Sequence, residues 1–230
     1  MMQIVVEPIW IREDAALQEL CERLAHQAAI ALDTEFMRTD TFYPIVGLLQ
    51  INDGRQTFLI DPLSIKDTDA LKKIMVNKDV TKVLHSCSED LEVFQTWLGV
   101  APVSIFDTQI AAAFVPLGYS LSYANLVKTL LNVEIPKDET RSDWLQRPLS
   151  VSQIQYAALD VVHMLIVYGK LLQMLKQRVV NIQTRNNFFV ILTCFFDNVF
   201  KIIIFGKNNK FVQGMINIKV GFFTYNNHTT

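Results

Sequence analysis

The chain has 230 residues and half of them are apolar, which allows one sizeable domain with its own core and a smaller additional segment. The formal net charge is -2, but residues 1–178 carry 16 Lys and Arg against 22 Asp and Glu, whereas residues 179–230 carry 5 against 1. Residues 1–178 are therefore too acidic to form a polybasic clamp for nucleic acid. Binding of a phosphate group by these residues would require metal ions or local clusters of cations.

The cysteines and the N-terminal residues indicate the compartment. Three scattered cysteines are too few for a disulfide framework or a zinc knuckle, which favours a reducing environment (Cys21, Cys87 and Cys194). Residues 1–10 include Glu7 and have no basic start ahead of an apolar run, so no signal peptide is expected. We therefore expect a cytoplasmic protein that does not associate with membranes.

The first third of the chain predicts a helix followed by three strands. Asp14 is expected to cap a helix whose apolar positions repeat at helical spacing from Leu17 to Leu24. The alternating stretch Ala31–Thr34 predicts a strand. Two short apolar segments flank an Asn-Asp-Gly-Arg turn and predict an antiparallel hairpin (Val46–Ile51 and Gln56–Ile60).

Short helices and strands then alternate up to a long final helix. Strands are expected at Lys82–Leu84 and Ser104–Phe106, and helices at Thr68–Met75, at Ser88–Trp97 ending at Gly99, at Thr108–Phe114 and at Leu121–Leu131. After the polar, irregular stretch Pro136–Pro148, a capping-box sequence at Ser150 opens one helix that reaches about Lys176. A meander of strands followed by this alternation predicts an α/β fold, a mixed β-sheet flanked by helices.

A pair of carboxylates lies on the first predicted strand. Asp33 and Glu35 are two residues apart, so their side chains project from the same side of the strand. Two adjacent like charges are tolerated when they face solvent, share a proton or hold a cation. An Asp-x-Glu tripeptide alone is most often solvated surface, so a metal site is indicated only if other residues of the chain can join the pair.

Three further residues can join this pair. Asp90 lies in the first turn of a helix directly after a buried strand, where ligands collect in α/β proteins, although it can equally complement the helix dipole. Tyr156 and Asp160 are four residues apart on the last helix and share one face. A buried Tyr that only bonds a neighbouring carboxylate is the alternative for that pair.

Together these residues form a set of four hard oxygen ligands with a phenol beside them. An all-carboxylate site selects Mg²⁺ or Mn²⁺ over zinc, which prefers His or Cys. Four carboxylates cannot share a pocket without divalent cations to offset their charge. Two such metal ions suit in-line cleavage of a phosphodiester, because one activates water and the other steadies the departing oxygen.

In this order and spacing, the motifs Asp33-x-Glu35, Asp90 and Tyr156-x-x-x-Asp160 resemble those of the DEDD 3′→5′ exonucleases, in the DEDDy subclass that has Tyr before the last Asp. Longer segments over about Met2–Leu175 are similar to the bacterial ribonuclease D family, among them LDTEF, GLLQI, LIDPL, HSCSEDLEVF, IFDTQIAAAF and YAALDV. The resemblance implies an RNase H-like exonuclease fold and removal of nucleotides from the single-stranded 3′ end of RNA, notably tRNA precursors.

The resemblance also implies roles for the five residues. Asp33, Glu35, Asp90 and Asp160 would bind the two divalent metal ions, and Tyr156 would orient or deprotonate the attacking water. A phenol is a poor base at neutral pH, because its ordinary pKa is about 10. Positioning of the attacking water is therefore the favoured role for Tyr156.

Several residues near these motifs are candidates for substrate binding. Phe36 and Met37 directly follow Glu35 and can stack under the terminal base, with core packing as the alternative. Thr34, which lies between Asp33 and Glu35 in the sequence, is also a candidate for substrate binding. His85 ends a strand near the site and can contact substrate, although a structural His that bonds a neighbouring loop is favoured.

The irregular stretch before the last helix carries cations. Lys137, Arg141 and Arg147 can hold the backbone of incoming RNA, with solvated surface charge as an equal alternative. Trp144 in the same stretch is expected to anchor packing. Asp107 is expected to cap the helix that follows it, although the resemblance places it close to the metal pocket.

The composition changes abruptly after Arg178. Residues 179–230 contain no Ala, no Glu and a single Leu, but 9 Phe and 9 Asn. Ribonuclease D continues here into helical HRDC domains, and nothing in this tail resembles them. We expect an exonuclease domain over residues 1–178, truncated after the catalytic domain by an altered reading frame, and a tail over 179–230 that is not a domain. An aggregation-prone β segment is favoured over a membrane span at Phe188–Gly206, because charged residues interrupt that run.

Three functional hypotheses remain. In the first, the domain is a metal-dependent 3′→5′ exoribonuclease. In the second, it is a catalytically impaired remnant that at most binds nucleic acid. In the third, the same chemistry acts on DNA 3′ ends, because no residue can be assigned to a 2′-hydroxyl contact. The complete set of four carboxylates and one tyrosine favours the first hypothesis.

Overall fold

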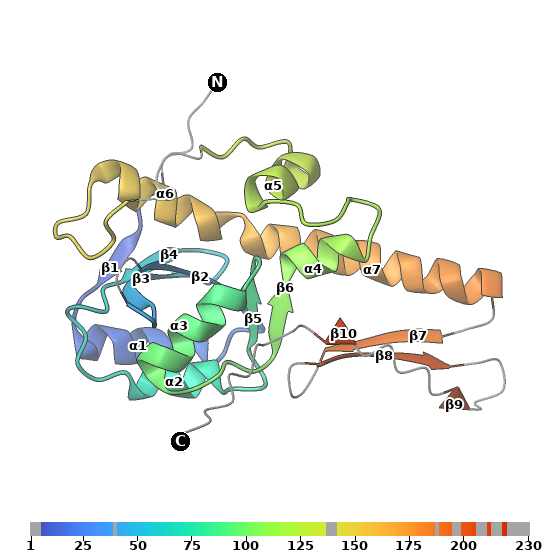
Figure 1. The fold of residues 1–230 in the computed structure, drawn as a ribbon, viewed down its shortest axis with the longest axis horizontal. Coiled ribbons are helices and arrows are strands. Elements are labelled where there is room, and N and C mark those ends of the chain that lie inside the picture. The colour runs from blue at the N-terminus through green and yellow to red at the C-terminus, as the bar shows by residue number, and fades with distance from the viewer. Residues whose placement is uncertain are drawn as a thin grey trace, which may run out of the picture. The chain divides into compact units, whose positions relative to one another are not determined.

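Figure 1 shows the chain as a computed structural model, which describes residues 6–38, 41–136, 142–186, 189–194, 199–205, 211–212 and 218–219. The chain divides into two units, Met1–Leu175 and Lys176–Thr230. The first unit contains all of the predicted site residues. The predicted boundary at residue 178 lies close to this division and stays a prediction.

A six-stranded mixed sheet forms the centre of the first unit, in the order β1-β4-β3-β2-β5-β6. The strands are β1 (Ile9–Ile11), β2 (Ala29–Met37), β3 (Ile45–Asn52), β4 (Thr57–Ile60), β5 (Thr81–Leu84) and β6 (Ile105–Asp107). Strands β2, β3 and β4 form the antiparallel meander, while β1 joins β4, and β5 joins β2 and β6, in parallel. The predicted mixed sheet with a meander is confirmed.

Helices cover both faces of this sheet (Figure 1). They are α1 (Asp14–Leu24), α2 (Asp69–Met75), α3 (Ser88–Leu98), α4 (Thr108–Ala113), α5 (Tyr123–Leu131), α6 (Val151–Val162) and α7 (Met164–Asn186). On one face, buried residues of α1, α2 and α3 form a core with alternate residues of β2, β3 and β4, such as Leu32 and Ile51. On the other face, α6 packs against β2, β3 and β4. Strand alternation thus sends Ile30 and Leu32 into one core and Ala31 into the other.

Residues at the ends of the elements confirm most of the expected boundaries. Gly99 ends α3 with a φ of 71°, a left-handed conformation that glycine adopts without strain. The predicted capping box is present at the start of α6, where Ser150 and Gln153 bond each other's backbone. The Asp107 side chain accepts from the backbone N–H of Gln109 and Ile110, so it caps α4 as expected.

Two expectations about the elements are wrong, and one strand was not predicted. Asp14 does not cap α1; it is the first helical residue, and its carboxylate accepts from the backbone N–H of Lys66 and Asp67. The single helix expected from Ser150 to Lys176 is two helices, which meet at His163. Strand β1 was not foreseen, because its three residues are ordered by pairing with β4, a contact distant in the sequence.

The second unit contains short strands. Strands β7 (Phe189–Cys194) and β8 (Val199–Phe205) pair antiparallel, and β9 (Phe211–Val212) and β10 (Ile218–Lys219) each pair with β8. Strand formation agrees with the β segment expected there, while its tendency to aggregate stays a prediction. Within the described part of the chain, the run Val151–Gln177 is long and apolar enough to cross a membrane by length and composition. The α6 part of that run has buried residues and packs against the sheet, as core helices do.

Candidate active site

A pocket of about 650 Å³ lies at the carboxyl ends of the parallel strands β2 and β5. Ligands of α/β proteins bind at this end of the strands. Nine of the residues predicted from the sequence line the pocket: Asp33, Thr34, Glu35, Phe36, Met37, His85, Asp90, Tyr156 and Asp160. The other two, Lys137 and Arg141, lie outside the described residues, so their role stays a prediction.

Three of the predicted carboxylates meet in this pocket. Asp33 and Glu35 project from β2 toward α6, which supplies Asp160, and one oxygen of each lies within 4.8 Å of the others. Asp90, in the first turn of α3, lines the same pocket and is outside that closest group. Its Oδ1 accepts a hydrogen bond of 2.6 Å from the Thr34 hydroxyl. Thr34 therefore points away from Asp33 and Glu35, as strand alternation requires, and holds Asp90.

Helix α6 positions the last two site residues. Tyr156 and Asp160 lie one turn apart on its face toward the sheet, and burial, followed by the charge of Asp160, raises the pKa of the Tyr156 hydroxyl. Small residues between them, Ala157 and Ala158, are fully buried, which lets the helix approach β2 and β3 closely. The start of the helix is fixed by the capping box at Ser150.

Burial raises the pKa of every carboxyl group in the pocket that belongs to the predicted set, and repulsion from other members of the set adds to the shift for Asp33 and Glu35. For Asp33, burial is the largest cause, followed by the charges of Asp90, Asp160 and Glu35. Burial likewise raises the pKa of Glu35 to about 9, of Asp160 to about 7 and of Asp90 to about 6. Such a cluster cannot be fully ionised at neutral pH unless a cation offsets its charge.

The donor set fits a divalent cation. All of the converging ligand atoms are carboxylate oxygens, which suit hard ions such as Mg²⁺, and the described pocket offers no thiolate that would favour zinc. The raised pKa values agree with this donor set, because a divalent cation would favour the charged carboxylates that burial, and for Asp33 and Glu35 also repulsion, disfavours. This acidic cluster is therefore one that can bind divalent metal ions.

His85 is engaged through both ring nitrogens. Its Nδ1 lies 2.9 Å from the Thr108 hydroxyl, and its Nε2 lies 3.0 Å from the carbonyl oxygen of Leu121 in the loop before α5. These contacts agree with the favoured structural role, in which the ring ties β5 to a neighbouring loop. The ring also lines the pocket, and contact with a substrate stays a prediction.

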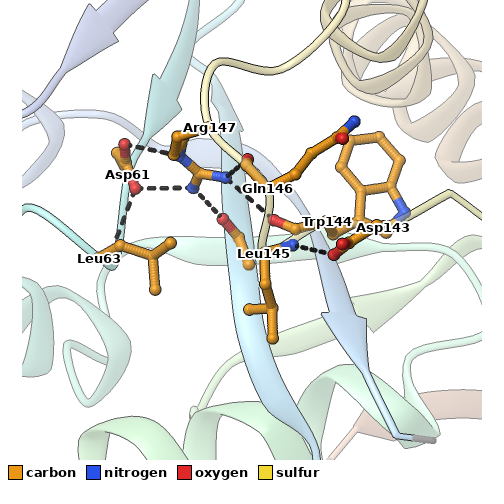
Figure 2. Close-up of polar contacts among 8 residues, drawn as sticks. Asp61, Leu63, Asp143, Trp144, Leu145, Gln146 and Arg147 are labelled. Carbon is orange, nitrogen blue, oxygen red and sulfur yellow. Dashed lines mark hydrogen bonds and ion pairs between the residues drawn. The ribbon is translucent and has the colours of Figure 1, made fainter.

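Two residues that were weighed from the sequence have defined structural roles. Trp144 is 2% exposed and packs with Leu48 and Leu59, which confirms it as a packing anchor. Arg147 is not a flexible cation, because it forms a bidentate ion pair with Asp61 (Figure 2). The hypothesis that Arg147 holds RNA is therefore wrong for this conformation.

Sequence reasoning missed several residues of the pocket wall. Arg38 is the only Lys or Arg among its described residues, and it pairs with Glu92 of α3 and lies over the Phe36 ring, 5.8 Å from its centroid. Tyr123 of α5 brings a second phenol, which is buried near Asp160. Arg38 follows the first motif closely enough to have been considered, whereas no local signal marks Tyr123. The remaining residues of the wall are Ser86, Glu89, Ser142, Trp144 and Met164.

Comparisons with known proteins agree with this geometry. Ribonuclease D of Pseudomonas paraeruginosa (strain DSM 24068 / PA7) is 54% identical over 159 residues, which are 69% of this chain and 42% of that protein. Ribonuclease D of Escherichia coli (strain K12) is 48% identical over 162 residues, which are 70% of this chain and 43% of that protein. The crystal structure of Escherichia coli RNase D, described as an exoribonuclease involved in structured RNA processing, matches with a TM-score of 0.72 and 45% identity, covering 75% of this chain and 46% of that one.

These matches confirm the resemblance to ribonuclease D and the predicted RNase H-like α/β fold. The chain spans less than half the length of these curated relatives. Residues 8–176, which include every described residue of the pocket, match the family of 3'-5' exonucleases. The chain thus belongs to the 3'-5' exonuclease family.

Proposed function

We propose that this chain is a metal-dependent 3′→5′ exoribonuclease that hydrolyses phosphodiester bonds from the 3′ end of RNA. The observation that carries the proposal is the convergence of Asp33, Glu35 and Asp160, whose oxygens lie within 4.8 Å of one another. Asp90 and Tyr156 complete the set at the same pocket. The similarity to ribonuclease D supports RNA as the substrate class.

The residues of the pocket divide the work of hydrolysis. Asp33, Glu35, Asp90 and Asp160 would hold two divalent ions, Mg²⁺ or Mn²⁺. When bound, such ions activate water and offset charge on the scissile phosphate. Tyr156, which lines the pocket one helical turn from Asp160, would orient the attacking water. Thr34 keeps the Asp90 carboxylate directed into the pocket.

The pocket wall also offers groups for the end of the RNA. Phe36 and Met37 are half-buried at the pocket and present apolar surface on which a terminal base can stack. Arg38 is placed to contact a phosphate if it exchanges Glu92 for the nucleic acid. Lys137 and Arg141, which precede the wall residue Ser142, extend this set of cations in our proposal.

We place the activity in the cytoplasm, acting on structured precursors such as those of tRNA. Buried, free thiols at Cys21 and Cys87 support a reducing compartment. The description of the matching Escherichia coli enzyme supports structured RNA as the substrate.

The test is incubation of the purified protein with a 5′-labelled RNA that has a single-stranded 3′ end, in Mg²⁺ or in Mn²⁺. We expect a ladder that shortens from the 3′ end and disappears with chelator or with Asp33→Ala. Asp79→Ala is the matched control, because Asp79 is an exposed carboxylate outside the pocket. A folded, metal-binding protein that leaves the RNA intact would overturn the proposal, and cleavage only of a DNA strand of the same sequence would move the activity to DNA 3′ ends.

A further inference from the structure

Arg147 has a partner for every N–H group of its guanidinium (Figure 2). Its Nε and Nη2 donate to the two carboxylate oxygens of Asp61 at 2.9 and 2.7 Å. Nη2 also donates to the carbonyl of Gly47 at 2.7 Å, and Nη1 donates to the carbonyls of Trp144 and Gln146 at 3.0 and 2.7 Å. All five N–H donors are therefore used, and the side chain is held in one conformation because any rotation would break several of these hydrogen bonds.

These bonds fasten the segment 143–147 to the sheet. Gly47 belongs to β3, and Asp61 directly follows β4, so Arg147 joins two neighbouring strands to its own segment. The segment lies directly on β3: a Cβ built on Gly47 would be 2.5 Å from the Trp144 carbonyl oxygen. Gly47 is therefore a close-approach glycine, and the Trp144 backbone has no space to move toward the strand.

The same segment is bonded to the first turn of α6. Gln153 donates from Nε2 to the carbonyl of Asp143 at 3.0 Å and accepts at Oε1 from Gln146 at 2.9 Å. Gln153 is 1% exposed, so its side chain is held in place by packing as well as by these partly buried bonds. Tyr156 follows Gln153 by three residues, which places it on nearly the same side of the helix, one turn along.

Trp144 links this segment to the site through its ring. The indole is 2% exposed, lines the pocket wall and lies with its ring centroid 6.2 Å from that of Tyr156. Moving the Trp144 backbone would move the surface against which the Tyr156 ring rests. The contact runs from Asp61 through the bonds of Arg147 and the buried Trp144 ring to Tyr156.

We infer that Arg147 is a positioning residue for the hydrolysis, which sets the place of the Tyr156 hydroxyl through Trp144. The inference rests on the proposed function, because Tyr156 has to act on the attacking water for its place to matter. A side chain that holds a reacting group has a large effect on turnover, since a displacement of about 1 Å can cost on the order of 100-fold in rate. Binding of RNA and of metal ions, which depend on other residues, does not pass through this contact.

The first experiment compares Arg147→Lys with the wild type in steady-state cleavage of the labelled RNA. Lysine keeps the charge and loses the planar, five-donor geometry. We expect kcat to fall about ten-fold or more, with KM and the metal concentration at half-maximal rate changed less than about two-fold. Arg23→Lys is the matched control, because the half-exposed Arg23 also pairs with an aspartate, Asp53 at 3.5 Å, but lies outside the pocket.

The second experiment separates positioning from general stabilisation. In a Tyr156→Phe background, Arg147→Lys should have little further effect on kcat, because the hydroxyl that it positions is gone. Full additivity of the two changes, or an unchanged kcat in Arg147→Lys, overturns the inference.

If Arg147→Lys does not fold, Asp61→Asn tests the same contact, since it removes the charge and one acceptor while keeping the side-chain shape. If the wild type and Arg23→Lys both fail to cleave RNA, the proposed function has failed, which is a different result from normal turnover in Arg147→Lys.

Discussion

The Tyr156 hydroxyl lies among carboxyl groups, and its pKa is raised above its ordinary range by burial first and then by the charges of Asp160, Glu35 and Asp33. The phenol therefore stays protonated at neutral pH and serves as a hydrogen-bond donor. This supports the positioning role and disfavours that of a base.

Replacement of Tyr156 by Phe keeps the ring against Trp144 and removes only the hydroxyl. We expect kcat to fall about 100-fold, while RNA affinity, measured by fluorescence anisotropy, stays within a factor of about two. Tyr168→Phe is the control, because Tyr168 packs against Phe106 outside the pocket. An unchanged cleavage rate would remove Tyr156 from the mechanism.

Thr34 holds Asp90 by a hydrogen bond at the pocket wall. Thr34→Val keeps the shape of the buried side chain and deletes the O–H that donates to Asp90 at 2.6 Å. Loss of a residue that hydrogen-bonds a metal ligand typically weakens metal affinity by about 10- to 100-fold. We expect the Mg²⁺ concentration for half-maximal cleavage to rise about ten-fold and Thr34→Ser to restore it. Equal Mg²⁺ dependence in wild type and Thr34→Val would show that the hydroxyl has no part in metal binding.

At the scale of elements, the ion pair between Asp61 and Arg147 should make stability depend on pH. Burial by itself would raise the pKa of Asp61. The hydrogen bond and charge of Arg147, together with the hydrogen bond from the Leu63 N–H, have the larger combined effect and lower this pKa below its ordinary value. The folded-state pKa is thus lower than the unfolded one, so this contribution is present above about pH 4 and is lost as pH falls through the folded-state value.

The corresponding variant is Asp61→Asn, compared with wild type by urea unfolding at several pH values. We expect the variant to be less stable at pH 7 and the difference to shrink on acidification below pH 4. Asp69→Asn is a suitable control, because Asp69 pairs with Lys72 on an exposed helix. A stability difference between Asp61→Asn and wild type that is constant from pH 7 to pH 3 would contradict this account.

Strand β5 depends on a buried lysine. The side chain of Lys82 is fully buried, and its Nζ donates to the carbonyls of Asn77 and Val80 at 2.6 and 2.7 Å. Lys82→Met removes both bonds and leaves two carbonyl groups without their partner, which we expect to destabilise the fold by about 1–3 kcal/mol. Lys73→Met, at an exposed position of α2, should change stability by less than about 0.5 kcal/mol. Denaturant unfolding measures both, and equal stability of the two variants would refute the role of Lys82.

These elements also show how far the sequence could predict the fold. The hairpin of β3 and β4 and the capping box of α6 were foreseen because their signals are local: a turn sequence and a Ser with a Gln three residues later. The break at His163 was missed, because no Gly or Pro interrupts the apolar run around it. The bonds of Arg147 were missed because Asp61 is 86 residues away in the sequence, so a long-range pairing decides whether that cation is free.

The candidate site was predictable for a different reason. Spacing of two and of four residues fixes which side chains share a face of a strand or helix, so the pairs Asp33 with Glu35 and Tyr156 with Asp160 followed from periodicity alone. That β2 and α6 lie together could only be inferred from the resemblance to a family. The wall residues Arg38 and Tyr123 depend on how the elements pack, which no spacing in the sequence reports.

For the whole molecule, the division into two units predicts that the first can be separated from the second. The buried residues of the core and all residues of the pocket lie within Met1–Leu175. We expect a protein of residues 1–178 to fold cooperatively and to cleave RNA at the rate of the 230-residue chain. Circular dichroism and the ladder assay test this, and an insoluble or inactive product would show that residues 179–230 are needed.

The position of α6 in the chain has a consequence for protein synthesis. Strands β2 and β3 and the Asp90 helix emerge from the ribosome well before residues 151–162, which carry Tyr156 and Asp160. Domains generally fold as units during translation. A nascent chain that lacks α6 therefore has an incomplete active site. The proposed activity should therefore appear only after α6 has emerged, and ribosome-bound chains stalled before and after α6 would reveal this timing.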